Sequence, residues 1–388
     1  MAHDLKHPDV QPRPVAVTAC ILIFGTIVCY LLLLPLQSSD IGEFLLPWFD
    51  VIDARGFAAM SGEYANYTPP YLYLLGTVSL FSSVVAPIYL IKSVGIAFTL
   101  FAAVVFSLIV HTITRDKRQA VIAACAFPLI PSVAINAAWW GQCDAIYTSF
   151  LLCAFLASLR KRPFLVIVFL SIAFSFKAQA IFFAPFLLFL LLNKEMPWRY
   201  LLVIPLIYAV MMTPAWLAGR SVAELATIYL NQGGYYRSLS MNSPNPWAVV
   251  VQFDLLSYEA GLVVGIAVAI VGNLWLIVSA RRKSWPPATV KLMLLSATLL
   301  LGPYLLPKMH DRYFFPADIF LILLAAIYPR LMAAAGAMQG ASVAVALGFL
   351  GVISRSYAVP SIIGALLTTI AVILVCRPLL QSRYQFAR

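Results

Sequence analysis

Charged residues are scarce in this chain. Only 11% of its 388 residues are Asp, Glu, Lys or Arg, whereas 62% are hydrophobic, and the mean hydropathy is +0.92. This composition excludes an ordinary water-soluble globule. Apolar runs of about 20 residues recur from end to end, which is the length that an α-helix needs to cross a bilayer. We therefore expect an all-α polytopic membrane protein.

Three further absences exclude whole classes of function. The six cysteines include no Cys-x-x-Cys pair and most lie in apolar runs, so we expect neither a disulfide framework nor a structural zinc site. The chain has no Gly-x-x-x-x-Gly-Lys-Ser/Thr loop and no Gly-x-Gly-x-x-Gly motif, so a cytosolic nucleotide donor is not supported. No polar stretch is long enough for a soluble domain, which predicts a single integral domain over residues 1–388.

Acidic residues are also fewer than basic ones, 15 against 26, which gives a net charge of +11. The basic residues cluster in short loops, at 115–118, 160–162 and 281–283. Short basic loops are typical of the cytoplasmic face of membrane proteins, so we expect the lipid bilayer as a partner and no nucleic acid. The first apolar run, 15–36, is too long for a typical signal peptide and is interpreted as a retained helix.

With the N-terminus in the cytoplasm, the apolar runs predict about twelve transmembrane helices. The expected spans are residues 15–36, 87–113, 120–138, 145–159, 164–176, 180–192, 201–217, 260–280, 288–306, 314–329, 338–354 and 358–376. Residues 37–83 and 218–253 then form two outer loops. The first is acidic, and its apolar spacing at 44–52 predicts short juxtamembrane helices. Residues 71–81 are interpreted as part of this loop, because a crossing there would move the basic loops outside.

In this topology the polar clusters of the sequence all fall on one face of the membrane. These clusters are Ser38–Asp40 with Glu43, residues 140–144, residues 176–179 and residues 308–312. Charged groups near hydrocarbon are costly, so a membrane protein that gathers them at one end of its helices uses them. The pattern predicts a site that faces away from the cytoplasm.

The cations of these clusters are suited to bind an anion. Lys177 has apolar residues on both sides, so its ammonium group requires a bound anion or a carboxylate partner. Arg312 follows His310 and Asp311 in a sequence that fits a phosphate-contact loop. The alternatives are that the cations extend from helix ends into water and that His310 is structural.

Two carboxylates are candidates for acid–base chemistry. Asp40 directly follows the first span, where it is either a helix cap or a general base. Asp144 lies four residues after Trp140, where it is either an interfacial anchor or part of the site. Carboxylates together with cations are the equipment for transferring a group from a phosphorylated donor, and a site in the membrane favours a lipid-borne one.

The order of these clusters, together with Tyr67-Thr68-Pro69-Pro70, resembles the GT-C membrane glycosyltransferases over residues 37–316. The most similar subgroup is that of polyprenyl-phosphate-sugar-dependent enzymes such as the dolichyl-phosphate-glucose glucosyltransferases and their bacterial relatives. The resemblance implies a site on the periplasmic or lumenal face of the inner (plasma) or endoplasmic reticulum membrane. It implies an inverting, single-displacement transfer of a hexose, such as glucose or mannose, from a polyprenyl-phosphate donor to a glycan or glycolipid acceptor.

The resemblance also implies roles for individual residues. Asp40 would be the catalytic base, and Lys177, His310 and Arg312 would bind the donor phosphate. The implied substrate-binding residues are Glu43, Tyr67, Gln142, Asp144 and Gln179. No cofactor is implied, and Asp40-Ile41-Gly42 stands where some relatives carry a paired Asp-x-Asp, so we expect no metal ligand and leave a divalent-metal requirement open.

A transporter or lipid flippase is the alternative, because many spans with charges near the membrane suit one. Two observations are against it: the halves of the chain show no repeat, and the charges crowd one face instead of the midplane.

Overall fold

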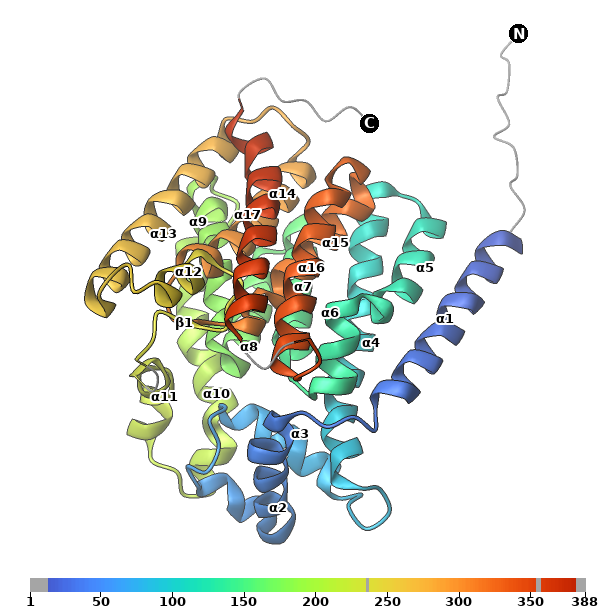
Figure 1. Cartoon of the computed structure of the whole chain (residues 1–388), viewed down its shortest axis with the longest axis vertical. Helices are drawn as coiled ribbons and strands as arrows, with labels where there is room; N and C mark the ends of the chain where they lie inside the picture. Colours follow the sequence, from blue (N-terminus) through green and yellow to red (C-terminus); the bar gives the residue numbers. More distant parts are fainter. Residues whose placement is uncertain (1–12, 235–236, 354–356, 382–388) are drawn as a thin grey trace.

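The structure is a computed structural model that describes residues 13–234, 237–353 and 357–381, and these fold almost entirely into α-helices (Figure 1). The all-α prediction is therefore confirmed. Residues 1–12, 235–236, 354–356 and 382–388 lie outside the described residues. They include parts of the predicted second outer loop and of the span expected at 338–354.

Seven helical segments of the described chain are long and apolar enough to cross a membrane. They contain α1 (Arg13–Leu33), α4 (Pro87–Thr114), α10 (Val203–Leu217), α13 (Tyr258–Arg281), α14 (Pro287–Leu305), α16 (Met332–Phe349) and α17 (Ala358–Leu380). Short 3-10 turns at Trp198–Leu202 and Pro329–Leu331 precede α10 and α16. An integral membrane protein follows from these lengths and compositions.

The span expected at 120–138 is broken. It consists of α5 (Lys117–Ala126) with a 3-10 turn at Phe127–Leu129, followed by α6 (Pro131–Ala134) and a π-helical turn at Ile135–Trp140. The two parts are bent by 49°. Ile130, which precedes Pro131, has an extended ψ of 125°, since a residue before proline is disfavoured in the helical region. Counted as one, this pair is an eighth candidate span.

Four further apolar helices are short, and they lie within other expected spans. They are α7 (Asp144–Leu159), α8 (Pro163–Phe176), α9 (Ala184–Leu192), which follows a 3-10 turn at Ala178–Phe183, and α15 (Phe315–Ile327). With 9 to 16 residues they are shorter than the roughly 20 that a perpendicular crossing requires. The structure therefore supports seven or eight candidate spans and does not confirm the count of twelve.

The two predicted outer loops contain short elements. The first holds a π-helical turn (Ile41–Leu45), α2 (Leu46–Arg55), a 3-10 turn (Gly56–Ser61) and α3 (Pro69–Ser79). The second holds α11 (Val222–Gly234), β1 (Ser240–Met241) and α12 (Pro246–Gln252). Strand β1 pairs in parallel with β2 (Met309–His310), which directly precedes the 3-10 turn Asp311–Phe314. This pairing brings the second loop to the polar cluster at 308–312.

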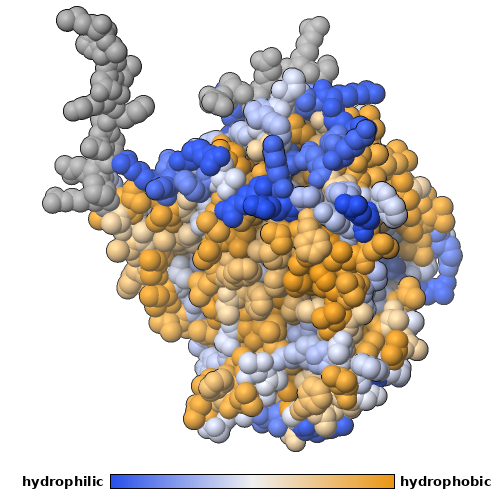
Figure 2. Space-filling view, turned by 180° about the vertical axis from the view of Figure 1, so that it is seen from behind, coloured by the Kyte–Doolittle hydropathy of each residue, from blue (hydrophilic) through white to orange (hydrophobic). Residues whose placement is uncertain are grey.

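The surface of the molecule is divided into hydrophobic and hydrophilic zones. Figure 2 shows a broad hydrophobic belt between two ends that carry hydrophilic side chains, which are denser at the top of the view. On α13, Val263, Val271 and Trp275 are 71%, 66% and 60% exposed. An exposed apolar face of this extent is typical of contact with lipid. Figure 1 places α2 and α3 at one end of the molecule and the basic α4–α5 and α13–α14 connections at the opposite end.

Candidate functional site

The predicted site residues gather around one cavity of about 810 Å³. Eight of the nine line it: Asp40, Glu43, Tyr67, Gln142, Lys177, Gln179, His310 and Arg312. Between them they come from the first outer loop, the turn before α7, the α8–α9 connection and the turn before α15. The volume lies in the range typical of small-molecule and cofactor sites.

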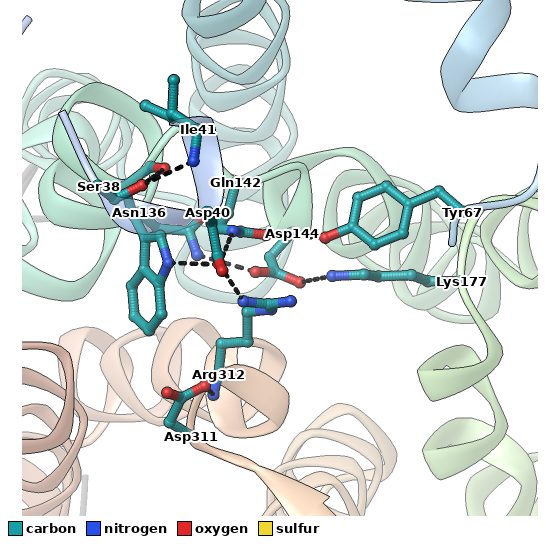
Figure 3. A network of polar contacts seen from close by, with 11 residues as sticks. Ser38, Asp40, Ile41, Tyr67, Asn136, Gln142, Asp144, Lys177, Asp311 and Arg312 are labelled. Atoms are coloured by element: carbon teal, nitrogen blue, oxygen red, sulfur yellow. Dashed lines mark hydrogen bonds and ion pairs between the residues drawn. The ribbon is translucent and has the colours of Figure 1, made fainter. Parts of the chain in front are cut away.

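One oxygen of Asp40 is fully engaged. Oδ2 accepts three hydrogen bonds, from Trp140 Nε1 at 2.8 Å, Gln142 Nε2 at 2.6 Å and Arg312 Nη1 at 2.7 Å (Figure 3). Oδ1 accepts no hydrogen bond from any residue that the structure describes. The side chain is 16% exposed and lines the cavity. Oδ1 is therefore the carboxylate atom that remains for a ligand.

The helix-cap interpretation of Asp40 is wrong. Its side chain makes no capping hydrogen bond to the helical turn that follows. Ser38 takes that place: its Oγ accepts a hydrogen bond from Ile41 N at 3.3 Å and donates one to the carbonyl of Trp140 at 2.9 Å. The Ser38 hydroxyl thus also joins the first outer loop to the turn before α7.

Asp144 has a different environment. Its Oδ1 lies 2.5 Å from Lys177 Nζ, and its Oδ2 accepts a hydrogen bond from Asn136 Nδ2 at 2.9 Å (Figure 3). The side chain is 1% exposed and does not line the cavity. In this structure Asp144 contacts Lys177 and Asn136 and does not face the cavity, an arrangement that suits a residue that holds Lys177 in place. Of the two partners expected for the Lys177 ammonium, the structure contains the carboxylate.

Tyr67 and Gln142 connect the two carboxylate–cation pairs. Tyr67 Oη donates to Gln142 Oε1 at 2.9 Å, while Nε2 of the same amide donates to Asp40. The Tyr67 ring also lies 5.2 Å from Lys177 Nζ, within the range of a cation–π contact. Burial raises the pKa of Tyr67 well above its ordinary value, against the opposing effect of Arg312, so the phenol stays protonated and remains a donor.

Close backbone packing fixes the turn that carries Gln142. Gly141 has φ +75°, and a Cβ on it would lie 2.8 Å from Ile41 Cδ1. Across the turn, a Cβ on Gly95 of α4 would lie 2.9 Å from the carbonyl oxygen of Gln142. Both positions require glycine, the first for its left-handed conformation as well as for space. The turn is thereby pressed between α4 and the segment that carries Asp40.

A buried lysine anchors the chain just before Asp40. Lys92 on α4 is fully buried, and its Nζ donates to the carbonyls of Leu34, at 2.7 Å, and Leu36. These carbonyls lie just beyond the end of α1, where no helical donors follow. The ammonium group therefore ties the end of α1 to α4 and sets the course of the chain toward Asp40.

The pKa values of His310 and Asp311 are shifted from their ordinary values. Burial, with the added effect of the Arg312 and Lys177 charges, lowers the pKa of His310 to about 3. The imidazole is therefore neutral near pH 7, so the expected contact of His310 with a phosphate is a hydrogen bond without charge. Burial raises the pKa of Asp311 to about 7, partly opposed by Arg312, whose backbone N–H donates to Asp311 Oδ1 at 2.9 Å.

Sequence reasoning missed three residues of this region. Asn136 orients Asp144, Lys92 anchors the chain before Asp40, and Arg220 lines the cavity with its side chain 6% exposed. Lys92 carried a usable signal, since a lysine inside an apolar run is a functional or structural site by default. Arg220 is an isolated base in a predicted loop and offered no such signal.

Metal ligands do not gather here. Within residues 13–234, 237–353 and 357–381, no group of three or more His, Cys, Asp or Glu side chains is arranged to hold a metal ion.

Comparison of the chain with protein-family models finds no matching family, and comparison with curated proteins finds no match.

Proposed function

We propose that the chain is a GT-C-type glycosyltransferase with about twelve spans that moves a hexose, such as glucose or mannose, from a polyprenyl-phosphate carrier to a lipid-linked or glycan acceptor. The proposed site faces the periplasm or lumen. The observation that carries this proposal is that Asp40, Lys177 and Arg312, which are far apart in the sequence, line a single cavity. A carboxylate beside two cations supplies both a proton acceptor and contacts for a phosphate leaving group.

In the proposed reaction, Asp40 Oδ1 accepts the proton of the acceptor hydroxyl. The acceptor oxygen forms a bond to the anomeric carbon of the sugar, while the bond from that carbon to the phosphate oxygen breaks. The polyprenyl phosphate leaves with the electron pair of the broken bond, and the anomeric configuration inverts. The three donors on Oδ2 keep the carboxylate oriented during this step.

The donor phosphate would contact cations that already have carboxylate partners. Lys177 pairs with Asp144 and Arg312 with Asp40, so the four charges cancel. Donor groups nevertheless remain, because an ammonium group has three N–H bonds and a guanidinium five. Arg312 Nε, for example, is buried and has no partner among the described residues. These N–H groups, with His310 as a neutral contact, are available to phosphate oxygens.

The test is to incubate the purified protein, in lipid nanodiscs, with a panel of polyprenyl-phosphate sugars and candidate acceptors, and to measure release of polyprenyl phosphate. We expect release with at least one sugar. Lys177→Ala and Arg312→Ala should each weaken donor binding by about 10- to 150-fold, the cost of losing a charge-assisted hydrogen bond. Unchanged donor binding in both variants would remove the phosphate assignment.

The transporter or flippase alternative predicts the reverse pattern. The donor lipid would then stay chemically intact, and reconstituted vesicles would show its movement between leaflets. Translocation without cleavage of any donor in the panel would contradict the glycosyltransferase proposal.

A further inference from the structure

Arg220 is a buried cation at the cavity that the proposed reaction does not use. It lies between α10 and α11, its side chain is 6% exposed, and it lines the cavity. Within the part of the chain that the structure describes, its guanidinium group donates no hydrogen bond, and Nε and Nη1 are buried without a partner. A buried charged group without acceptors is costly, which indicates that an acceptor comes from a bound ligand.

The ion-pair partner of Arg220 does not satisfy it. Glu224 Oε2 lies 3.9 Å from Arg220 Nε, beyond hydrogen-bond reach, and the glutamate side chain is 45% exposed. Exposed ion pairs of this kind contribute little. Lys177 and Arg312, in contrast, lie 2.5 Å and 2.7 Å from their carboxylates. Arg220 is thus less well neutralised than these two cations.

The segment that carries Tyr64 lies beside the segment that carries Arg220. A Cβ on Gly219 would lie 3.9 Å from Ser61 Cβ, and a Cβ on Gly62 would lie 2.9 Å from the Tyr64 ring. The Tyr64 hydroxyl is buried and has no partner among the described residues. Tyr64 does not line the cavity, however, so Arg220 is the unpartnered donor of this region that a ligand in the cavity can reach.

We propose that Arg220 forms an oxyanion subsite that takes a phosphate group of a substrate, outside the hydrogen-bond network of Asp40. Arginine suits this ligand because its planar fork binds two phosphate oxygens at once. The phosphate is either that of the lipid carrier or one on the acceptor. This inference rests on the proposed function, since it assumes that a phosphate-bearing substrate enters the cavity.

The experiment measures equilibrium binding of two phosphate probes to the full chain in nanodiscs. The first probe is polyprenyl monophosphate, with polyprenol as its phosphate-free control, and the second is glucose 6-phosphate, with glucose as its control. Arg220→Gln should weaken binding of one phosphate probe by about 10- to 100-fold and leave the phosphate-free controls unchanged. A loss confined to polyprenyl monophosphate assigns the carrier phosphate, and a loss confined to glucose 6-phosphate assigns the acceptor.

Two further variants keep the test decisive. Arg237→Gln removes an arginine of the same predicted loop that is 77% exposed and pairs with Glu259, so it should change neither probe. Glu224→Gln removes the carboxylate that competes for Arg220, and it should tighten phosphate binding about two- to fivefold even if Arg220→Gln fails to fold. If the wild-type protein binds a phosphate probe and neither Arg220→Gln nor Glu224→Gln changes that binding, the subsite is overturned and the proposed function is not. A wild-type protein that binds neither phosphate probe overturns the subsite together with the proposed function.

Discussion

Two aspartates of this cavity region show how environment separates residues of the same type. Asp40 is 16% exposed and has one oxygen without a donor among the described residues. Asp144 is 1% exposed, and its two oxygens accept from Lys177 and Asn136. A general base must reach the proton that it removes. The geometry therefore favours Asp40 for that step and a positioning role for Asp144.

Asp40→Asn should fold and bind the donor but lose turnover by roughly 10²- to 10⁴-fold, because an amide keeps the shape of the side chain and does not accept the proton. Turnover is measured as release of polyprenyl phosphate at saturating donor. Glu43→Gln is the matched control: it removes another carboxylate that lines the cavity, one that makes no ion pair in the described chain. A larger loss in Glu43→Gln than in Asp40→Asn would reverse the assignment of the base.

The pKa of Asp311, raised to about 7 by burial, predicts a pH-dependent cost to stability. The ordinary pKa of an aspartate is 3.8. Between pH 3.8 and about pH 7 the folded protein binds the Asp311 proton more tightly than the unfolded chain does, so the free energy of unfolding falls as pH rises through this range. Above about pH 7 both states have lost the proton, and the cost stays constant. Asp311→Asn should remove that cost. We expect it to raise the melting temperature by at least about 2 °C more at pH 8 than at pH 5.

The measurement is thermal unfolding of both proteins in detergent at the two pH values. An equal effect of Asp311→Asn at pH 5 and pH 8 would contradict the raised pKa. Retention of the hydrogen bond from the Arg312 backbone is expected, since asparagine keeps an acceptor oxygen.

Most of the site could be predicted at this scale because polar side chains stand out in an apolar sequence. The pairing between them could not. Arg312 lies 272 positions from Asp40, and Lys177 lies 33 from Asp144, so no local pattern shows which carboxylate each cation meets. For the same reason the sequence does not show that Asp144 is buried and pairs with Lys177, and Arg220, alone among uncharged neighbours, was missed.

Among the elements, the turn before α7 is the one on which the site depends most. It carries Trp140 and Gln142, both donors to Asp40, and it passes through Gly141 in a left-handed conformation. Gly141→Ala should destabilise the protein by about 1–3 kcal/mol and reduce turnover, because the added Cβ is strained in that conformation and collides with Ile41.

The matched control is Gly336→Ala in α16. A Cβ at Gly336 has no atom within 4 Å, so alanine should be neutral or stabilise the helix by up to about 1 kcal/mol. Thermal unfolding and turnover of both variants provide the comparison. Equal behaviour of the two alanine variants would show that the turn does not depend on glycine.

Element boundaries were predictable where a helix is long and apolar, and unpredictable where it is interrupted. The helices α4, α13 and α17 lie within a few residues of their predicted ranges. The span expected at 120–138 is broken at Pro131, and hydropathy averaged over a window does not register such a break. The short helices α7 and α15 are almost entirely buried, so protein surrounds them where a lipid-facing span has hydrocarbon.

For the whole molecule, the charge distribution predicts which end faces the cytoplasm. In a variant without native cysteines, a membrane-impermeant thiol reagent added from outside should label Asp53→Cys and should not label Lys117→Cys or Ser284→Cys. All three side chains are exposed, and Asp53 lies on α2, at the opposite end from the α4–α5 and α13–α14 connections (Figure 1).

Permeabilised membranes provide the control, because all three positions should then be labelled. Outside labelling of Lys117→Cys in sealed cells would invert the orientation and place the cavity on the cytoplasmic side.

The hydrogen bonds from Lys92 to the carbonyls of Leu34 and Leu36 also imply an order in which the site assembles during synthesis. The ribosome makes α1 and the segment of Asp40 first, at a time when the lysine that will hold them has not been translated. The partners of the Asp40 segment are therefore translated after it: first α4, then Gln142, and finally Arg312, more than 270 residues later. A nascent chain that ends before Arg312 would therefore carry Asp40 without its full set of hydrogen-bond donors.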